Sequence, residues 1–195
     1  MPKLVDYDER RSELAEAAAN LIARAGIGAA TMRDVAAEAG WTTGALTHYF
    51  ADKRELLLFT FQASLERRRA AREASDTTDP LVQLTSSLEG ALPSDDDRRR
   101  HWTVTIAFCA QATGDPDLAA AQRDAYREFR AHVAGLVERC GLATGRSAEI
   151  LAERLIAAAD GIAVQALFDP ELWPPKHQLE TLHAATAPLL TTSVN

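Results

Sequence analysis

Several features that mark other classes of protein are scarce or absent in this sequence. Cysteine occurs twice among 195 residues, too rarely for a disulfide framework, and two cysteines fit a reducing compartment. No run of about 18 or more apolar residues is present, which argues against a membrane-spanning helix. The first residues lack the basic and apolar pattern of a signal peptide. We therefore expect a cytoplasmic protein with no membrane partner.

Patterns that carry catalysis or bind metals are also missing. The histidines stand at positions 48, 101, 132, 177 and 183, so no two share a helix face at a spacing of three or four, and no carboxylates cluster with them at metal-ligand spacing. The glycines of residues 26–31 lack the third glycine and the preceding strand of a dinucleotide loop. No Ser-His-Asp or Cys-His arrangement can be proposed. The sequence therefore predicts no metal, no cofactor and a protein that is not an enzyme.

The charge of the chain leaves a nucleic-acid partner open. The net charge is −7, but residues 1–72 carry 11 basic and 10 acidic side chains, so the acidic excess lies in residues 73–195. Nucleic-acid binding depends on local phosphate contacts more than on total charge. A nearly neutral N-terminal region can therefore bind DNA, although charge alone does not predict that it does.

The composition and the helix signals predict an all-α protein. Ala, Leu, Arg and Glu, which favour helices, are abundant, whereas alternating β-branched runs are missing. Caps, prolines and glycines predict about nine helices, over residues 8–25, 32–39, 43–49, 53–74, 80–93, 95–113, 116–141, 148–167 and 176–190. Gly26 is expected to end the first helix, Asp52 to cap the fourth and Ser147 to cap the eighth.

Residues 31–50 have the pattern of a helix-turn-helix. Two short predicted helices meet at Gly40, which can take the positive φ that a tight turn needs. Small Ala36 and Ala39 let the helices approach closely, and Leu46 and Phe50 give the second helix an inner face. The outer face carries small or hydrogen-bonding groups, which suit a DNA groove better than the Glu and Lys mixture of an ordinary solvated face.

The stretch 10–57 resembles the DNA-binding domain of TetR-family transcriptional repressors. The matching residues are Ala17, Ala18, Gly26, Thr31, Arg33, Asp34, Val35, Ala36, Ala39, Gly40, Gly44, Leu46, His48, Tyr49, Phe50, Lys53, Leu56 and Leu57. The resemblance implies a three-helix helix-turn-helix domain over residues 1–52 and an effector-binding and dimerisation domain over residues 53–195, with the helix 53–74 connecting them. It also implies a bacterial protein of the cytosol and nucleoid.

In that family the third helix enters the major groove. The resemblance implies that residues at helix N-termini contact phosphates and that the outer face of the third helix contacts bases or the adjacent backbone. The implied DNA-binding residues are Thr31, Arg33, Thr42, Thr43, Gly44, Ala45, Thr47, His48, Tyr49 and Lys53. Two residues depart from the family pattern, because Trp41 stands where Val or Ile is frequent and Thr47 where an aromatic residue is usual.

Residues 80–190 resemble more loosely the branch of the family that includes the repressor of choline-to-betaine genes. The resemblance implies a homodimer, built from the last two long helices, on a palindromic operator, and a pocket for a small-molecule effector. Candidate dimer-interface residues are Leu151, Leu155, Ala159, Ile162, Leu179, Leu182 and Leu189. Candidate effector-pocket residues are Phe61, Trp102, Phe108, Gln111, Tyr126, Phe129, Asp160, Gln165, Phe168 and Trp173. Aromatic rings beside one carboxylate favour a cation, which makes an ammonium-bearing effector a hypothesis.

The predicted function is a ligand-responsive transcriptional repressor that is released from its operator by a small molecule. Two alternatives remain open. In the first alternative the protein is a DNA-binding regulator without an effector, which a filled core would favour. In the second it is a helical protein-interaction module, which a failure to bind any duplex specifically would favour.

Overall fold

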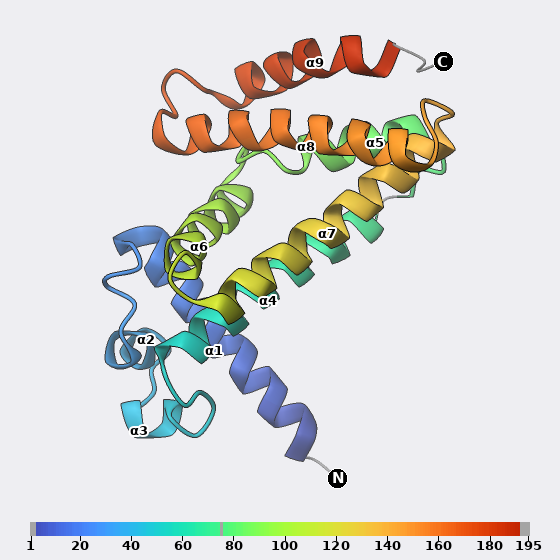
Figure 1. Cartoon of the computed structure of the whole chain (residues 1–195). Coiled ribbons are helices and arrows are strands. Elements are labelled where there is room, and N and C mark those ends of the chain that lie inside the picture. Colours follow the sequence, from blue (N-terminus) through green and yellow to red (C-terminus); the bar gives the residue numbers. More distant parts are fainter. Residues whose placement is uncertain (1–2, 75, 192–195) are drawn as a thin grey trace. The chain divides into compact units, whose positions relative to one another are not determined.

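The computed structural model describes residues 3–74 and 76–191, and this part of the chain contains nine α-helices and no strand (Figure 1). The helices are α1 (Lys3–Ala25), α2 (Met32–Glu38), α3 (Thr43–Leu46), α4 (Lys53–Glu73), α5 (Pro80–Glu89), α6 (Asp96–Ala112), α7 (Pro116–Arg139), α8 (Gly145–Phe168) and α9 (Pro175–Thr191). The all-α fold predicted from composition and caps is confirmed.

The chain forms two compact units. Unit 1 comprises Met1–Arg68 and Thr103–Gln122, and unit 2 comprises Arg69–Trp102 and Arg123–Asn195. The end of α6 and the beginning of α7 therefore belong with the N-terminal helices. The family resemblance implies a boundary at residue 52 between a DNA-binding domain and an effector-binding domain, and this boundary remains a prediction.

Unit 1 is built around the apolar faces of α1, α2 and α4. Leu14, Ala18 and Ile22 on α1 are buried, and α1 packs on α2, which packs on α3. The phenyl rings of Phe61 and Phe108 stack with their centroids 4.0 Å apart and their planes 7° from parallel. Both rings are fully buried, and burial of such apolar surface is the main force holding helices together.

Unit 2 is built around α8, which packs along α9 and also contacts α5. Alanine and leucine or isoleucine alternate on the buried face of α8, so that small side chains let the neighbouring helices come close. The carboxyl end of this helix is closed by Arg99, whose guanidinium donates to the carbonyls of Ala166 and Leu167 at 3.2 and 2.8 Å. The arginine run 98–100 therefore includes a residue that caps a helix.

Most helix ends fall near the residues that the sequence predicts, and four do not. Helix α1 begins at Lys3 rather than near Asp8, α3 ends at Leu46 rather than near Tyr49, and α5 ends at Glu89 rather than near Pro93. Helix α8 begins at Gly145, with Thr144 before it making no side-chain cap bond, so the prediction of a cap at Ser147 was wrong. A Ser is a plausible cap wherever it precedes an apolar run, and only the backbone decides which residue is used.

None of the helices within the two described stretches combines the length and the apolar character that crossing a membrane requires.

Candidate nucleic-acid interface

Two threonine caps define the ends of the helix-turn-helix. Thr31 precedes α2, and its Oγ1 accepts from the N–H of Asp34 at 3.2 Å and donates to the Asp34 carboxylate at 2.6 Å. Thr42 precedes α3, and its Oγ1 accepts from the N–H of Ala45 at 3.1 Å. Between the two helices Gly40 has φ +73°, the left-handed conformation that glycine adopts without strain. The turn at Gly40 that the sequence predicts is confirmed.

The outer surface of this motif is open to solvent. The residues Thr31, Arg33, Thr42, Thr43, Gly44, Thr47 and His48 are exposed, and Ala45 and Tyr49 are half-buried. The hydroxyl of Thr47 donates to the carbonyl of Gly44 at 2.8 Å. Exposed hydroxyls on a short, capped helix can donate to or accept from base edges and phosphates. Contact of these residues with DNA remains a prediction.

Lys53, a predicted DNA-binding residue, also makes a contact within the protein. Its Nζ donates to the backbone carbonyl of Ile27 at 2.8 Å, which ties the beginning of α4 to the loop after α1. An ammonium group has three donors, so this bond leaves donors for a phosphate.

We expect Lys53→Ala to weaken binding to every duplex and to lower the slope of log affinity against log salt by about one unit, as the loss of one phosphate contact does. Fluorescence anisotropy at several salt concentrations measures the slope. Lys176→Ala, in the first turn of α9, is the matched control because it removes one positive charge from unit 2. An unchanged slope together with a lower melting temperature would assign Lys53 to the Ile27 contact alone.

An aromatic cluster lies beside α3, which is the expected recognition helix and is called the reading helix below. This cluster was not predicted from the sequence. Tyr49 packs edge-on against Trp41, with centroids 5.4 Å apart, and against Tyr7 on α1 at 5.0 Å. The guanidinium of Arg10 lies 5.6 Å from the Trp41 ring. Because α1 begins five residues earlier than expected, Tyr7 reaches Tyr49. Trp41, unusual at its position in the family, is therefore part of this aromatic cluster.

The beginning of α4 is held by polar contacts on two sides. Arg11 on α1 lies over the rings of Phe50 and Phe59, at 4.6 and 4.4 Å, and pairs with Glu55 at 2.9 Å. Asp52 accepts from the N–H of Glu55 at 2.8 Å, which is the predicted cap.

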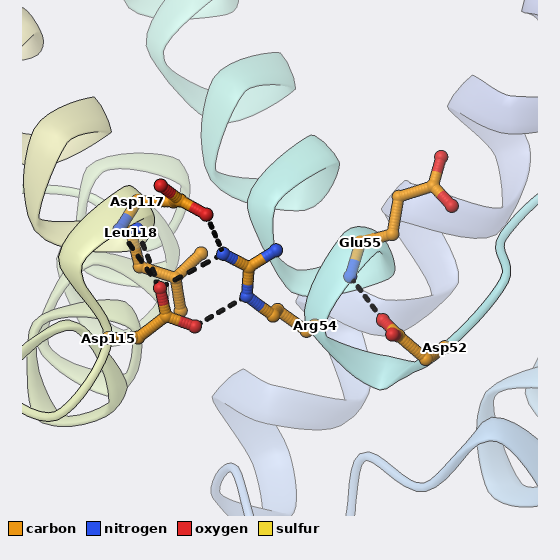
Figure 2. A network of polar contacts seen from close by, with 6 residues as sticks. All are labelled: Asp52, Arg54, Glu55, Asp115, Asp117 and Leu118. Atoms are coloured by element: carbon orange, nitrogen blue, oxygen red, sulfur yellow. Dashed lines mark hydrogen bonds and ion pairs between the residues drawn. The ribbon is translucent and has the colours of Figure 1, made fainter.

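Arg54, on the other side, binds two carboxylates of the α6–α7 turn (Figure 2). Its Nη2 lies 3.0 Å from Oδ1 of Asp115 and 2.6 Å from Oδ2 of Asp117, and its Nε bonds to Oδ2 of Asp115. Asp115 also caps α7, accepting from the N–H groups of Asp117 and Leu118. The hydrogen bonds from Arg54 and then from the Leu118 N–H hold the pKa of the Asp115 carboxyl well below its usual range.

The effector-pocket candidates are divided between the two units. In unit 1, Phe61 and Phe108 are packed against each other, and Gln111 is exposed and lines a cleft of about 570 Å³ with Arg54 and Asp115. In unit 2, Trp102 is buried and donates to the carbonyl of Ala91, while Phe168 is 73% exposed. Phe129 and Trp173 are half-buried against His132 and His177 respectively, and Gln165 is exposed. The pocket assignment stays a prediction.

One pair of candidates in unit 2 is brought together. The hydroxyl of Tyr126 on α7 donates to the carboxylate of Asp160 on α8 at 2.8 Å. Burial raises the pKa of the Asp160 carboxyl, and the hydrogen bond from Tyr126 opposes this effect more weakly. Among the described residues no basic side chain pairs with Asp160. A positive charge placed beside a half-buried carboxylate that has no basic partner would stabilise its ionised form.

The dimer-interface candidates mostly face the interior of unit 2. Leu151, Leu155, Ala159, Ile162 and Leu182 are buried, whereas Leu179 and Leu189 are half-buried. The apolar period of a helix marks its buried face, but it does not tell whether the cover comes from the same chain or from another. Here α8 and α9 cover each other.

A histidine between α5 and α7 gives unit 2 a pH-sensitive contact. Nε2 of His132 lies 3.0 Å from the hydroxyl of Ser87, and the residue is half-buried. Burial, followed by the nearby charges of Arg72 and Arg139, lowers the pKa of His132. The folded state therefore favours the neutral ring, and the unfolded chain takes up the proton first as the pH falls.

We expect the free energy of unfolding to fall as the pH drops below about 6.5, the pKa of an unperturbed histidine, until the lowered folded-state pKa is passed. Urea unfolding at pH 7.5 and at steps down to pH 5 measures this. The loss should be smaller in His132→Gln, which cannot titrate. An identical loss in the variant would place the pH dependence on other groups.

In the described part of the chain, an all-α fold that carries a helix-turn-helix with an exposed, capped second helix is typical of helix-turn-helix transcription regulators. Residues 14–58 match the family of bacterial regulatory proteins named after tetR, and residues 80–191 match the C-terminal region of BetI-type transcriptional repressors. The regulator PksA of Bacillus subtilis strain 168 is 34% identical over 173 residues, which cover 87% of this chain and 84% of PksA.

Solved structures agree with this assignment. A transcriptional regulator from Rhodococcus sp. RHA1 is 29% identical and superimposes with a TM-score of 0.84 over 92% of this chain and 95% of its own. A putative regulator from Saccharomonospora viridis, solved in complex with choline, has the same fold at 24% identity, with a TM-score of 0.82 over 92% of this chain and 96% of that one. The chain belongs to the TetR family and is a DNA-binding transcriptional repressor.

Proposed function

We propose that this repressor binds a palindromic operator as a homodimer in the bacterial cytosol and is released by a small organic cation. The observation that carries the effector half of the proposal is the carboxylate of Asp160, which is half-buried, bonded to the Tyr126 hydroxyl and without a basic partner among the described residues. A trimethylammonium or similar group would supply the missing charge, and the Tyr126 ring would favour it through a cation–π contact. The S. viridis regulator, bound to choline, shares the fold.

The dimer half of the proposal rests on the exposed face of α8. Apolar or small residues recur there at spacings of seven, four, three and four, which places them on one side of the helix. They are Ile150, Ala157, Gly161, Val164 and Phe168, all of them exposed. Such a stripe suits close pairing with the same helix of a second copy, and a two-fold dimer matches a palindromic operator.

Light scattering after size exclusion tests the dimer. We expect a dimer at micromolar concentration, and a monomer for Gly161→Glu, which places a charge in the middle of the stripe where a side chain meets no neighbour. Ala131→Glu, on an exposed position of α7, is the matched control and should remain dimeric. A monomeric parent protein would contradict the dimer.

Release of labelled operator, followed by fluorescence anisotropy, tests the effector. Choline and larger quaternary ammonium compounds should release the DNA, whereas 3,3-dimethylbutanol, the uncharged analogue of choline, should not. Asp160→Asn should keep its operator affinity but lose the response, while Asp124→Asn, which removes an exposed carboxylate of α7, should respond normally. Release by the uncharged analogue, or an unchanged response of Asp160→Asn, would contradict the cation site.

A further inference from the structure

The first turn of α4 joins four parts of unit 1 through four consecutive residues. Asp52 caps the helix, Lys53 binds the carbonyl of Ile27, and Glu55 binds Arg11 and the N–H of Ala51. Arg54 makes the remaining connection, to the α6–α7 turn (Figure 2). Since only residues 47–52 separate α3 from α4, the orientation of this turn constrains the reading helix.

The Arg54 contacts have the geometry of a clamp. The guanidinium offers Nε and Nη2 to both oxygens of Asp115, and Nη2 also contacts Asp117, an arrangement in which planar Arg is fixed in direction as well as in distance. Asp115 is itself fixed as the cap of α7. Because Arg54 lowers the pKa of this carboxyl, the clamp stays charged from mildly acidic to alkaline pH.

The same contacts argue against a phosphate-binding role for Arg54. Its side chain is 44% exposed, but it faces two carboxylates, one of them 82% exposed. A phosphate approaching the guanidinium would meet two negative charges for one positive charge, whereas the neighbouring Lys53 faces only a backbone carbonyl. Arg54 is therefore placed to hold the helix rather than to bind DNA.

We propose that Arg54, Asp115 and Asp117 form a positioning clamp for operator binding. The clamp limits the rotation of the first turn of α4, and so of α3, in the DNA-free protein. Specific binding needs the reading helix in one orientation and therefore gains from this restriction. Non-specific binding through phosphates does not. The inference depends on the DNA-binding function alone and not on the proposed dimer or cation effector.

Two neutral variants test the clamp in the effector-free protein. Arg54→Gln removes the cation, and Asp115→Asn removes the charge while keeping an oxygen that caps α7, because Asn is as good a helix cap as Asp. The probe is an operator fragment selected from genomic DNA with the parent protein, and the comparison is a scrambled duplex of equal length. Arg127→Gln and Asp124→Asn disrupt the exposed pair at 2.7 Å on α7 and are the matched controls.

We expect both clamp variants to weaken operator binding by about three- to tenfold, the range that losing up to about 1.4 kcal/mol gives. Their affinity for the scrambled duplex and their salt slopes should not change. The double variant should bind the operator no more weakly than Arg54→Gln alone, since each change breaks the same contact. Arg54→Lys, which keeps the charge without the planar fork, should fall between the parent protein and Arg54→Gln.

A phosphate-binding role for Arg54 predicts a change in DNA affinity of the opposite sign for Asp115→Asn. If Arg54 binds phosphate, Asp115→Asn frees it and strengthens binding to both duplexes, and Arg54→Gln lowers the salt slope by about one unit. Either result overturns the clamp. Unchanged operator affinity in both variants, with only the melting temperature lowered, also overturns it, because the contact would then serve stability alone.

Discussion

Replacing Thr43 by Asp is expected to reduce operator affinity by at least about 100-fold, because a carboxylate on the exposed face of α3 would meet the negative potential of DNA and lose a polar contact there. Thr43 is the first residue of α3 and is exposed. An acidic residue in the first turn of a helix interacts favourably with the helix dipole. The substitution should therefore leave the helix folded, so that lost binding reports on the interface and not on unfolding.

Ser147→Asp is the matched control for Thr43→Asp. It also places a carboxylate in the first turn of a helix, since α8 begins at Gly145, and its side chain is exposed in unit 2. It should keep the operator affinity of the parent protein. Equal affinities of the two variants, measured by anisotropy at one salt concentration, would show that the outer face of α3 does not meet DNA.

The helix-turn-helix was predictable because its signals are local. The caps at Thr31 and Thr42 and the turn at Gly40 each depend on side-chain and backbone chemistry within four residues. The same is true of the cap at Asp52. Such features can be recognised in a sequence without knowledge of what lies next to them in space.

The clamp and the aromatic cluster were not predictable because they depend on distant residues. Arg54 and Asp115 are 61 positions apart, and nothing near either residue marks the other as its partner. Tyr7 reaches Tyr49 only because α1 extends to Lys3, and an amphipathic pattern fixes the ends of a helix poorly.

The buried face of α8 shows a second limit on what can be predicted from a sequence. Leu155, Ala159 and Ile162, which the family resemblance assigns to a dimer interface, recur at spacings of four and three and are buried. The period cannot tell which chain provides the cover, and α9 of the same chain covers this face. The face left open carries Ala157 and Gly161, residues whose small size gives little hydrophobic signal in a sequence.

Phe108→Ala is expected to lower the free energy of unfolding by about 3–5 kcal/mol, the usual cost of removing a fully buried phenyl ring. Phe108 is completely buried, and its ring lies parallel to that of Phe61 at 4.0 Å. The substitution removes this stacking and leaves a cavity that rigid neighbouring helices fill only in part. Urea unfolding at neutral pH measures the loss.

Leu172→Ala provides the control, because this side chain is 62% exposed, lies outside the proposed dimer stripe, and its removal should change the stability by less than about 0.5 kcal/mol. The comparison also tests whether Phe61 and Phe108 line an effector pocket. A ring that lines a ligand-sized hollow already lacks neighbours on one side, so its removal costs little. A loss below about 1 kcal/mol for Phe108→Ala would therefore contradict tight packing and favour the pocket, whereas the full loss would place both rings in the core of unit 1.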